Sequence, residues 1–161
     1  MSLETLAAAL HASELAHTLR ASIWLYPLIN TGHVIGIGLL FGAIVPLDLR
    51  LLGCWSGVPL DHLPRALLPV TIAGLLLALG TGSLLFATRP LDYIVEPLFA
   101  IKMALLCAAL INALVLRLSP QWRWARVSAG GTVPPSWRVA ALASLLLWIG
   151  VITAGRLIGY R

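Results

Sequence analysis

Four long apolar segments constrain this chain more than any other feature of its sequence. Each is about 20 residues long, which is the length of helix that crosses the roughly 30 Å hydrocarbon core of a bilayer. Hydrophobic residues make up 60% of the chain and charged residues only 11%, and a soluble domain of this size could not cover so much apolar surface with a polar shell. The sequence therefore predicts an all-α integral membrane four-helix bundle, with residues 1–161 forming a single transmembrane domain in the lipid bilayer.

The apolar segments set the expected limits of the spans. The first span, at 23–47, contains no acid, lysine or arginine and is rich in glycine and proline. The other three are expected at 67–88, 97–116 and 139–158. Short loops between the spans leave no room for a soluble domain.

The segments outside the spans are amphipathic or aromatic. Residues 2–20 place leucines on one helical face and interrupt them with acids and histidines. This pattern predicts an N-terminal amphipathic helix lying in the membrane interface, and the pattern weakens near Ser13, where we expect a break. Residues 119–138 hold Trp122, Trp124 and Trp137 and predict an interfacial loop with an aromatic belt.

Arginines give the orientation. Six of them flank one end of the spans and four flank the other, and the richer end is expected to face the cytoplasm. This places the loops after the first and third spans inside and both termini outside, which is the periplasm if the membrane is a bacterial inner membrane. The richer set is Arg50, Arg65, Arg117, Arg123, Arg126 and Arg138, and the other is Arg20, Arg89, Arg156 and Arg161.

Several other functional interpretations find little support. The net charge of +5 forms no basic stripe, so we expect no nucleic acid partner. His11 and His17 are six residues apart, which puts them on different helical faces and argues against a metal site. Asp48 and Arg50 fit an ordinary charged pair at the boundary of the first span.

Ionisable residues inside the spans are the candidates for function, because a charged side chain at mid-helix costs about 2.5–3.5 kcal/mol on insertion scales. His33, Lys102 and Arg156 stand out in this respect, together with Gly80 and Gly82. Counted from the span ends at about 1.5 Å per residue, all of them lie roughly 8–12 Å below the surface that carries the termini. One layer of the bundle is therefore expected to hold an imidazole, an amine, a guanidinium and a glycine-lined gap.

This combination suits a haem better than a bare metal ion, which would need several close ligands. His33 is the expected iron ligand, with Gly32 and Gly36 leaving space beside its ring. Asn30, one turn earlier, is expected to hold the other imidazole nitrogen. Lys102 is a candidate for the second metal ligand, and Arg156 for a propionate partner.

Simpler explanations exist for each of these residues. His33 can hydrogen-bond to a neighbouring helix, and the glycines can serve helix packing alone. Lys102 and Arg156 are shallow enough for their charged ends to reach the surface. What favours a cofactor is the common depth of these residues rather than any one of them.

Two parts of the sequence resemble known families. Residues 25–53, LYPLINTGHVIGIGLLFGAIVPLDLRLLG, are similar to the signature of an uncharacterised family of small bacterial membrane proteins. More distantly, His33 followed by PLFAIK at 97–102 resembles the copper-resistance D-type membrane proteins and the small bacterial membrane protoporphyrinogen oxidases. In the oxidase group the matching histidine and lysine are linked to haem b, and the resemblance implies that role for His33 and Lys102.

The expected function is that of a haem b membrane protein that transfers electrons, between quinol and an external redox partner. Two alternatives remain open: an enzyme resembling the protoporphyrinogen oxidases, and a non-redox membrane subunit or transporter, including a copper-related one. Copper import would call for clusters of methionine or histidine, and the chain has only two methionines. Assembly as a homo-oligomer is compatible with each of these functions.

The orientation can be tested by cysteine labelling. A membrane-impermeant thiol reagent added from outside should modify a cysteine placed near Asp92 and should not reach one placed near Ser128. The opposite pattern would move the layer that holds His33 to the inner leaflet.

Overall fold

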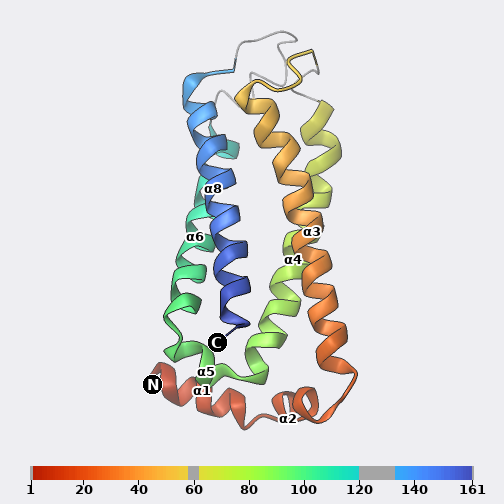
Figure 1. Cartoon of the computed structure of the whole chain (residues 1–161), viewed down its shortest axis with the longest axis vertical. Coiled ribbons are helices and arrows are strands. Elements are labelled where there is room, and N and C mark those ends of the chain that lie inside the picture. Colours follow the sequence, from red (N-terminus) through yellow and green to blue (C-terminus); the bar gives the residue numbers. More distant parts are fainter. Residues whose placement is uncertain (1, 58–61, 120–132, 161) are drawn as a thin grey trace.

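The fold is a bundle of four long helices, seen in a computed structural model that describes residues 2–57, 62–119 and 133–160. The helices are α3 (Leu25–Leu52), α4 (His62–Thr88), α6 (Pro97–Leu118) and α8 (Pro135–Ile158). Each is long and apolar enough to cross a membrane, and successive helices run in opposite directions (Figure 1). The predicted all-α membrane bundle is confirmed.

The bundle consists of two helix pairs. α3 packs along α4, and α6 packs along α8. The pairs meet where α3 packs against α8, a contact that we call the α3–α8 seam, whereas the backbones of α4 and α6 do not approach each other closely within the described residues. α4 and α6 meet through side chains, among them the stacked rings of Phe86 and Phe99.

All four long helices are longer than the spans that hydropathy predicts. α3 continues past residue 47 to Leu52 and ends at Gly53, whose φ of +113° is a left-handed conformation that glycine adopts without strain. Asp48 and Arg50 therefore lie inside a helix, and both are buried. An exposed charged pair at the boundary of the first span was expected; both side chains are instead buried, and Gly53 marks the end of the helix.

α4 and α8 also begin before their expected spans, and α6 ends two residues beyond its own. The early start of α8 places Trp137 in its first turn, where the indole is buried instead of lying in an interfacial loop. The expected aromatic belt residues Trp122 and Trp124 lie outside the described residues.

Short helices cover the end of the bundle that carries the N-terminus. α1 (Leu3–His11) and α2 (Glu14–Ala21) are separate helices, and the expected break falls before Ser13, whose hydroxyl caps α2 by accepting a hydrogen bond from the Ala16 amide. A further short helix, α5 (Pro90–Val95), links α4 to α6 and was not predicted. Figure 1 shows α1 and α2 lying across the bundle axis, as an interfacial segment would.

Arg20 ties this end together. Its guanidinium donates to the carbonyl oxygen of His11 at 2.9 Å and to that of Thr88, the last residue of α4, at 3.2 Å. One side chain thus joins α1, α2 and α4, and it fixes the interfacial helices to the bundle.

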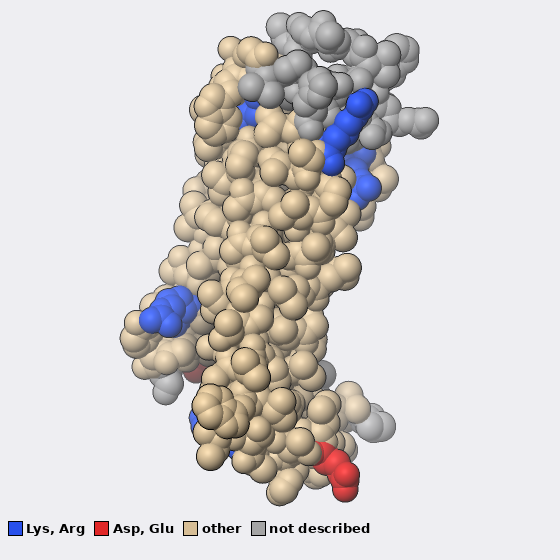
Figure 2. Space-filling model, turned by 90° about the vertical axis from the view of Figure 1, so that its right-hand side faces the viewer, with Lys and Arg blue, Asp and Glu red and all other residues tan. Residues whose placement is uncertain are grey.

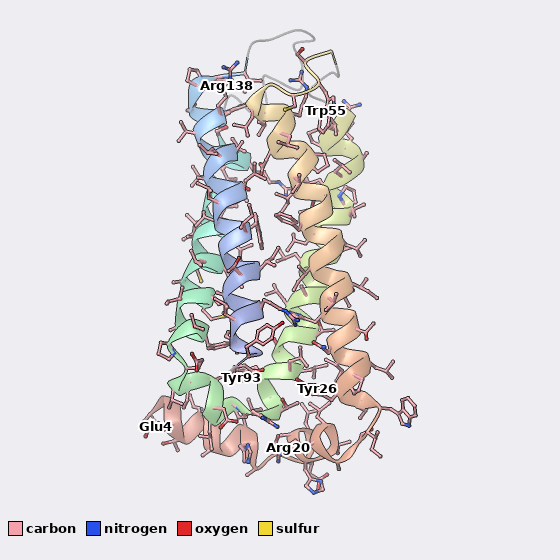
Figure 3. All side chains as sticks on the ribbon, in the orientation of Figure 1. Glu4, Arg20, Tyr26, Trp55, Tyr93 and Arg138 are labelled. Carbon is pink, nitrogen blue, oxygen red and sulfur yellow. The ribbon has the colours of Figure 1, made fainter. Side chains whose placement is uncertain are left out.

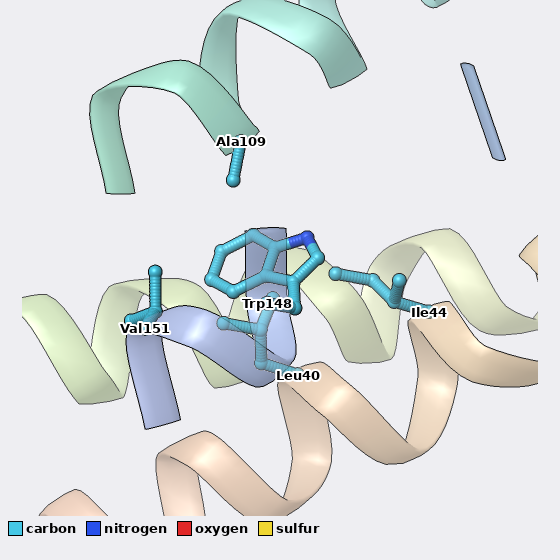
Figure 4. Packing of buried hydrophobic residues seen from close by; sticks show 5 residues of the cluster. All are labelled: Leu40, Ile44, Ala109, Trp148 and Val151. Carbon is cyan, nitrogen blue, oxygen red and sulfur yellow. The ribbon is translucent and has the colours of Figure 1, made fainter. Parts of the chain in front are cut away.

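The buried core follows the α3–α8 seam. Leu40 and Ile44 of α3 surround the ring of Trp148 from α8, and Val151 and Ala109 complete the cluster (Figure 4). Elsewhere the surface is apolar. On the face shown in Figure 2, most of the surface is uncharged; acidic side chains lie at the lower end, and basic ones lie near the upper end and in one group on the left edge below mid-height.

Two glycines bring the backbones of α3 and α4 into direct contact. A Cβ atom added at Gly36 would lie 2.7 Å from the amide nitrogen of Ala78, and one added at Gly74 would lie 2.5 Å from that of Leu40. Neither position accepts a side chain without moving a helix. Small residues at such crossings are a common basis of helix association in membranes.

We therefore expect Gly36→Ala to destabilise the protein by about 1–3 kcal/mol, the usual cost of overpacking. Gly38→Ala is the matched control, because a Cβ atom there meets nothing within 4 Å and alanine is the better helix former by about 1 kcal/mol. Thermal unfolding in detergent should lower the Tm of the first variant only. Equal Tm values for the two variants would contradict this packing.

Candidate functional site

His33 is held against α4 by its Nδ1 atom. This half-buried side chain projects from α3, and Nδ1 lies 2.9 Å from the carbonyl oxygen of Ala78 and 3.2 Å from the hydroxyl oxygen of Thr81. The Thr81 hydroxyl donates its own hydrogen to the Leu77 carbonyl at 2.6 Å. Both neighbours of Nδ1 are therefore acceptors, so Nδ1 carries the hydrogen and donates it to Ala78.

This arrangement sets the tautomer of the neutral ring. With the hydrogen on Nδ1, the lone pair is on Nε2, and no hydrogen bond reaches Nε2 from the described part of the chain. An imidazole fixed through one nitrogen by a backbone carbonyl is how proteins orient a histidine that ligates metal through the other.

Gly82 provides the space that the ring occupies. A Cβ atom at Gly82 would lie 3.0 Å from Cε1 of His33, so any other residue would displace the imidazole. Gly32 lies on the same contact, since its Cβ atom would meet the Thr81 methyl group at 3.2 Å. Of the predicted glycines, Gly32, Gly36 and Gly82 thus face the contact between α3 and α4.

Lys102 approaches this layer from the other helix pair. It is half-buried on α6, and its side chain runs along Gly155 of α8, where an added Cβ atom would lie 3.4 Å from Cε and 3.5 Å from Nζ. Lys102 and His33 thus lie near the same end of the bundle, on different helix pairs.

Three aromatic rings close this layer on the side of the termini. Phe86 of α4, Tyr93 of α5 and Phe99 of α6 pack with ring centroids 5.2–5.9 Å apart. Phe86 follows Gly82 by one turn, and Phe99 precedes Lys102 by about one turn. Sequence reasoning missed this cluster because its members come from three helices, one of them unpredicted; Figure 3 shows Tyr93 beside the ends of the long helices.

The Tyr93 hydroxyl stays neutral at physiological pH. Burial raises its pKa above the ordinary value of a tyrosine, Tyr26 and Asp92 nearby add to that effect, and the positive charge of Arg89 opposes it. A neutral phenol is a hydrogen-bond donor. The Tyr93 hydroxyl is therefore a polar group in an otherwise apolar cluster of aromatic rings.

The remaining predicted residues lie elsewhere. Arg156 is exposed near the end of α8, where it donates to the Tyr160 hydroxyl at 2.8 Å and stacks over that ring. Asn30 is exposed, and the Ala78 carbonyl occupies the position at Nδ1 that was expected for it. Gly80 faces outward, with nothing within 4 Å of an added Cβ atom.

Comparison of the chain with protein-family models, with curated proteins and with solved structures found no match. In the described part of the chain, no group of three or more histidine, cysteine, aspartate or glutamate side chains is arranged to hold a metal ion. The candidate site therefore consists of one oriented imidazole, one amine and the glycines and aromatic rings around them.

The geometry predicts a single tautomer for His33. Nitrogen-15 NMR of the histidine rings at alkaline pH, where imidazole is neutral, should show a protonated Nδ1 and an unprotonated Nε2 at this residue. Gly82→Ala should displace the ring and shift both signals, whereas Gly42→Ala, at a position with open space, should leave them unchanged. A mixture of tautomers in the unmodified protein would contradict the assigned hydrogen bond.

Proposed function

We propose that this protein is a haem b-binding membrane protein that transfers electrons between quinol and an external redox partner. The observation that carries the proposal is the state of His33, whose Nδ1 atom is held by a backbone carbonyl while Nε2 keeps its lone pair. A haem needs only one or two axial ligands from the protein, so a single oriented imidazole is sufficient for binding.

The surroundings of His33 fit a flat apolar group with a charged edge. Gly82 lets the imidazole pack closely against α4, and the Ala78 carbonyl would raise the basicity of the ligating ring. A haem would lie toward the α4 and α6 side of the bundle, where the two backbones do not approach each other closely and Phe86 stacks on Phe99.

Lys102 and Arg156 would hold the other parts of the group. Lys102 reaches the layer from the opposite helix pair and would be the second axial ligand or a propionate partner. Arg156 is near the end of α8, with a guanidinium whose planar donors match a carboxylate. A haem supplies one-electron chemistry when bound, and burial and ligand identity would set its potential.

The proposed direction of electron transfer follows from the depth of the His33 layer in the membrane. The layer lies near the end of the bundle that carries the interfacial helices, which the arginine bias places in the periplasm of a bacterial inner membrane. Quinol would arrive from the bilayer, and the external partner would accept electrons across the end covered by α1, α2 and the aromatic cluster. A homo-oligomer is compatible with the exposure of α6, of whose residues Ala109 alone is buried.

The protein purified in mild detergent should show the Soret band and reduced α-band of a b-type haem. His33→Ala should abolish both bands, because the iron loses its strongest bond to the protein. His17→Ala is the matched control: this histidine is exposed on α2 and its removal should leave the spectrum unchanged. Lys102→Ala should weaken binding or alter the spectrum, and Arg156→Ala should lower haem affinity more mildly.

Two outcomes would redirect the proposal. A colourless protein from cells well supplied with haem would overturn it, and a non-redox membrane subunit or transporter would then lead. A coloured protein that oxidises protoporphyrinogen in a direct assay would be an enzyme of the oxidase kind and not an electron carrier.

A further inference from the structure

Asp48 is a buried acid in the membrane-spanning part of the bundle, far from the layer around His33. It lies on the α3–α8 seam, 5% exposed, one turn before α3 ends at Leu52. The 15 residues that separate it from His33 correspond to roughly 22 Å along the helix. A carboxyl group at such a position is costly unless it serves a purpose.

Only one of the two oxygens of the Asp48 carboxyl group has a hydrogen-bond partner among the described residues. The Ser144 side chain of α8, itself 7% exposed, hydrogen-bonds to Asp48 across the seam. The second oxygen, Oδ2, is buried and has no hydrogen-bond partner among the described residues. An ionised carboxylate has about four acceptor positions to fill, so one hydroxyl leaves an anion largely uncompensated here.

The surroundings of this carboxyl group are mainly apolar. Ile44 precedes Asp48 by one turn on α3, and Trp148 follows Ser144 by one turn on α8. The Trp148 indole N–H is also buried without a partner in the described part of the chain, and Figure 4 shows the indole nitrogen on the side of Ile44, the end of the seam that leads to Asp48. The seam thus holds one unpaired donor and one unpaired acceptor among the described residues.

Cationic residues occur at this end of the bundle on every neighbouring helix. Arg50 is buried on α3 and donates to the carbonyl oxygen of Ser56 at 3.1 Å. Arg65, Arg117 and Arg138 are exposed near the ends of α4, α6 and α8. The partner that the structure gives Asp48 is the neutral hydroxyl of Ser144, so its state depends on burial more than on a paired cation.

We propose that Asp48 is a proton-binding site of the bundle. The side chain is the neutral acid in the folded protein, with Ser144 donating to one oxygen and the proton on Oδ2, and the proton exchanges with the water at the near end of the seam. Carboxyl groups placed in this way carry protons in membrane pumps and transporters. The inference goes beyond the haem proposal and does not depend on it.

Infrared spectroscopy of the full-length protein in lipid tests this site at pH 7, because a neutral carboxylic acid has a C=O stretching band that a carboxylate lacks. Wild-type protein should show this band, and transfer into D2O should shift it. Asp48→Asn should remove it, since the amide imitates the shape of the neutral acid without its band. Asp92→Asn, at an exposed acid of α5, is the control that leaves it in place.

The test gives a decision for each outcome. Labelling aspartate with carbon-13 in the wild-type protein assigns the band even if the Asn variant does not fold, and Ser144→Ala should move the band to higher frequency by removing its hydrogen bond. Absence of an aspartate-dependent band at pH 7 would show that Asp48 is ionised and would overturn the proposal. A band that does not shift in D2O would show a proton that cannot exchange, and would overturn it equally.

Discussion

The contact between the backbones of α3 and α4 determines the position of the imidazole in the candidate site. Gly36 and Gly74 allow the two helices to touch, and the same Ala78 whose amide lies against Gly36 provides the carbonyl that holds His33. The crossing point therefore sets the register in which His33 lies over Gly82. A side chain at Gly36 or Gly74 would move the acceptor away from the imidazole without touching the imidazole itself.

The second feature of the architecture is its asymmetry. The helix pairs are joined along the α3–α8 seam, which is filled by Trp148 and its aliphatic neighbours, while the backbones of α4 and α6 stay apart in the described part of the chain. At that second edge the pairs meet through side chains, including the stacked rings of Phe86 and Phe99. The polar exception in the seam is the Asp48 and Ser144 pair, at the opposite end from His33, so the two proposed sites are separate in space and in chemistry.

Much of the fold follows from the sequence because the bilayer imposes a simple requirement on length and polarity. That requirement does not predict where each helix ends. Hydropathy ends the first span at residue 47, before the charged Asp48 and Arg50, whereas the helix itself ends at Gly53. The layer of His33 and Lys102 was also predicted from depth alone, by counting residues from the end of each span. Depth does not tell which way a side chain points, so Asn30 and Gly80 were placed at the right level but face outward. The Ala78 carbonyl could not be predicted, because every residue has one and only the helix crossing selects it.

The proposed haem site depends most on His33 binding the iron through Nε2. Chemical rescue tests this point directly: His33→Gly leaves a space of the size of the lost ring, which free imidazole can enter. We predict that the variant is purified without haem, and that adding imidazole together with haem restores a b-type spectrum close to that of the unmodified protein. A His33→Gly variant that retains its full haem content without imidazole would contradict the assignment.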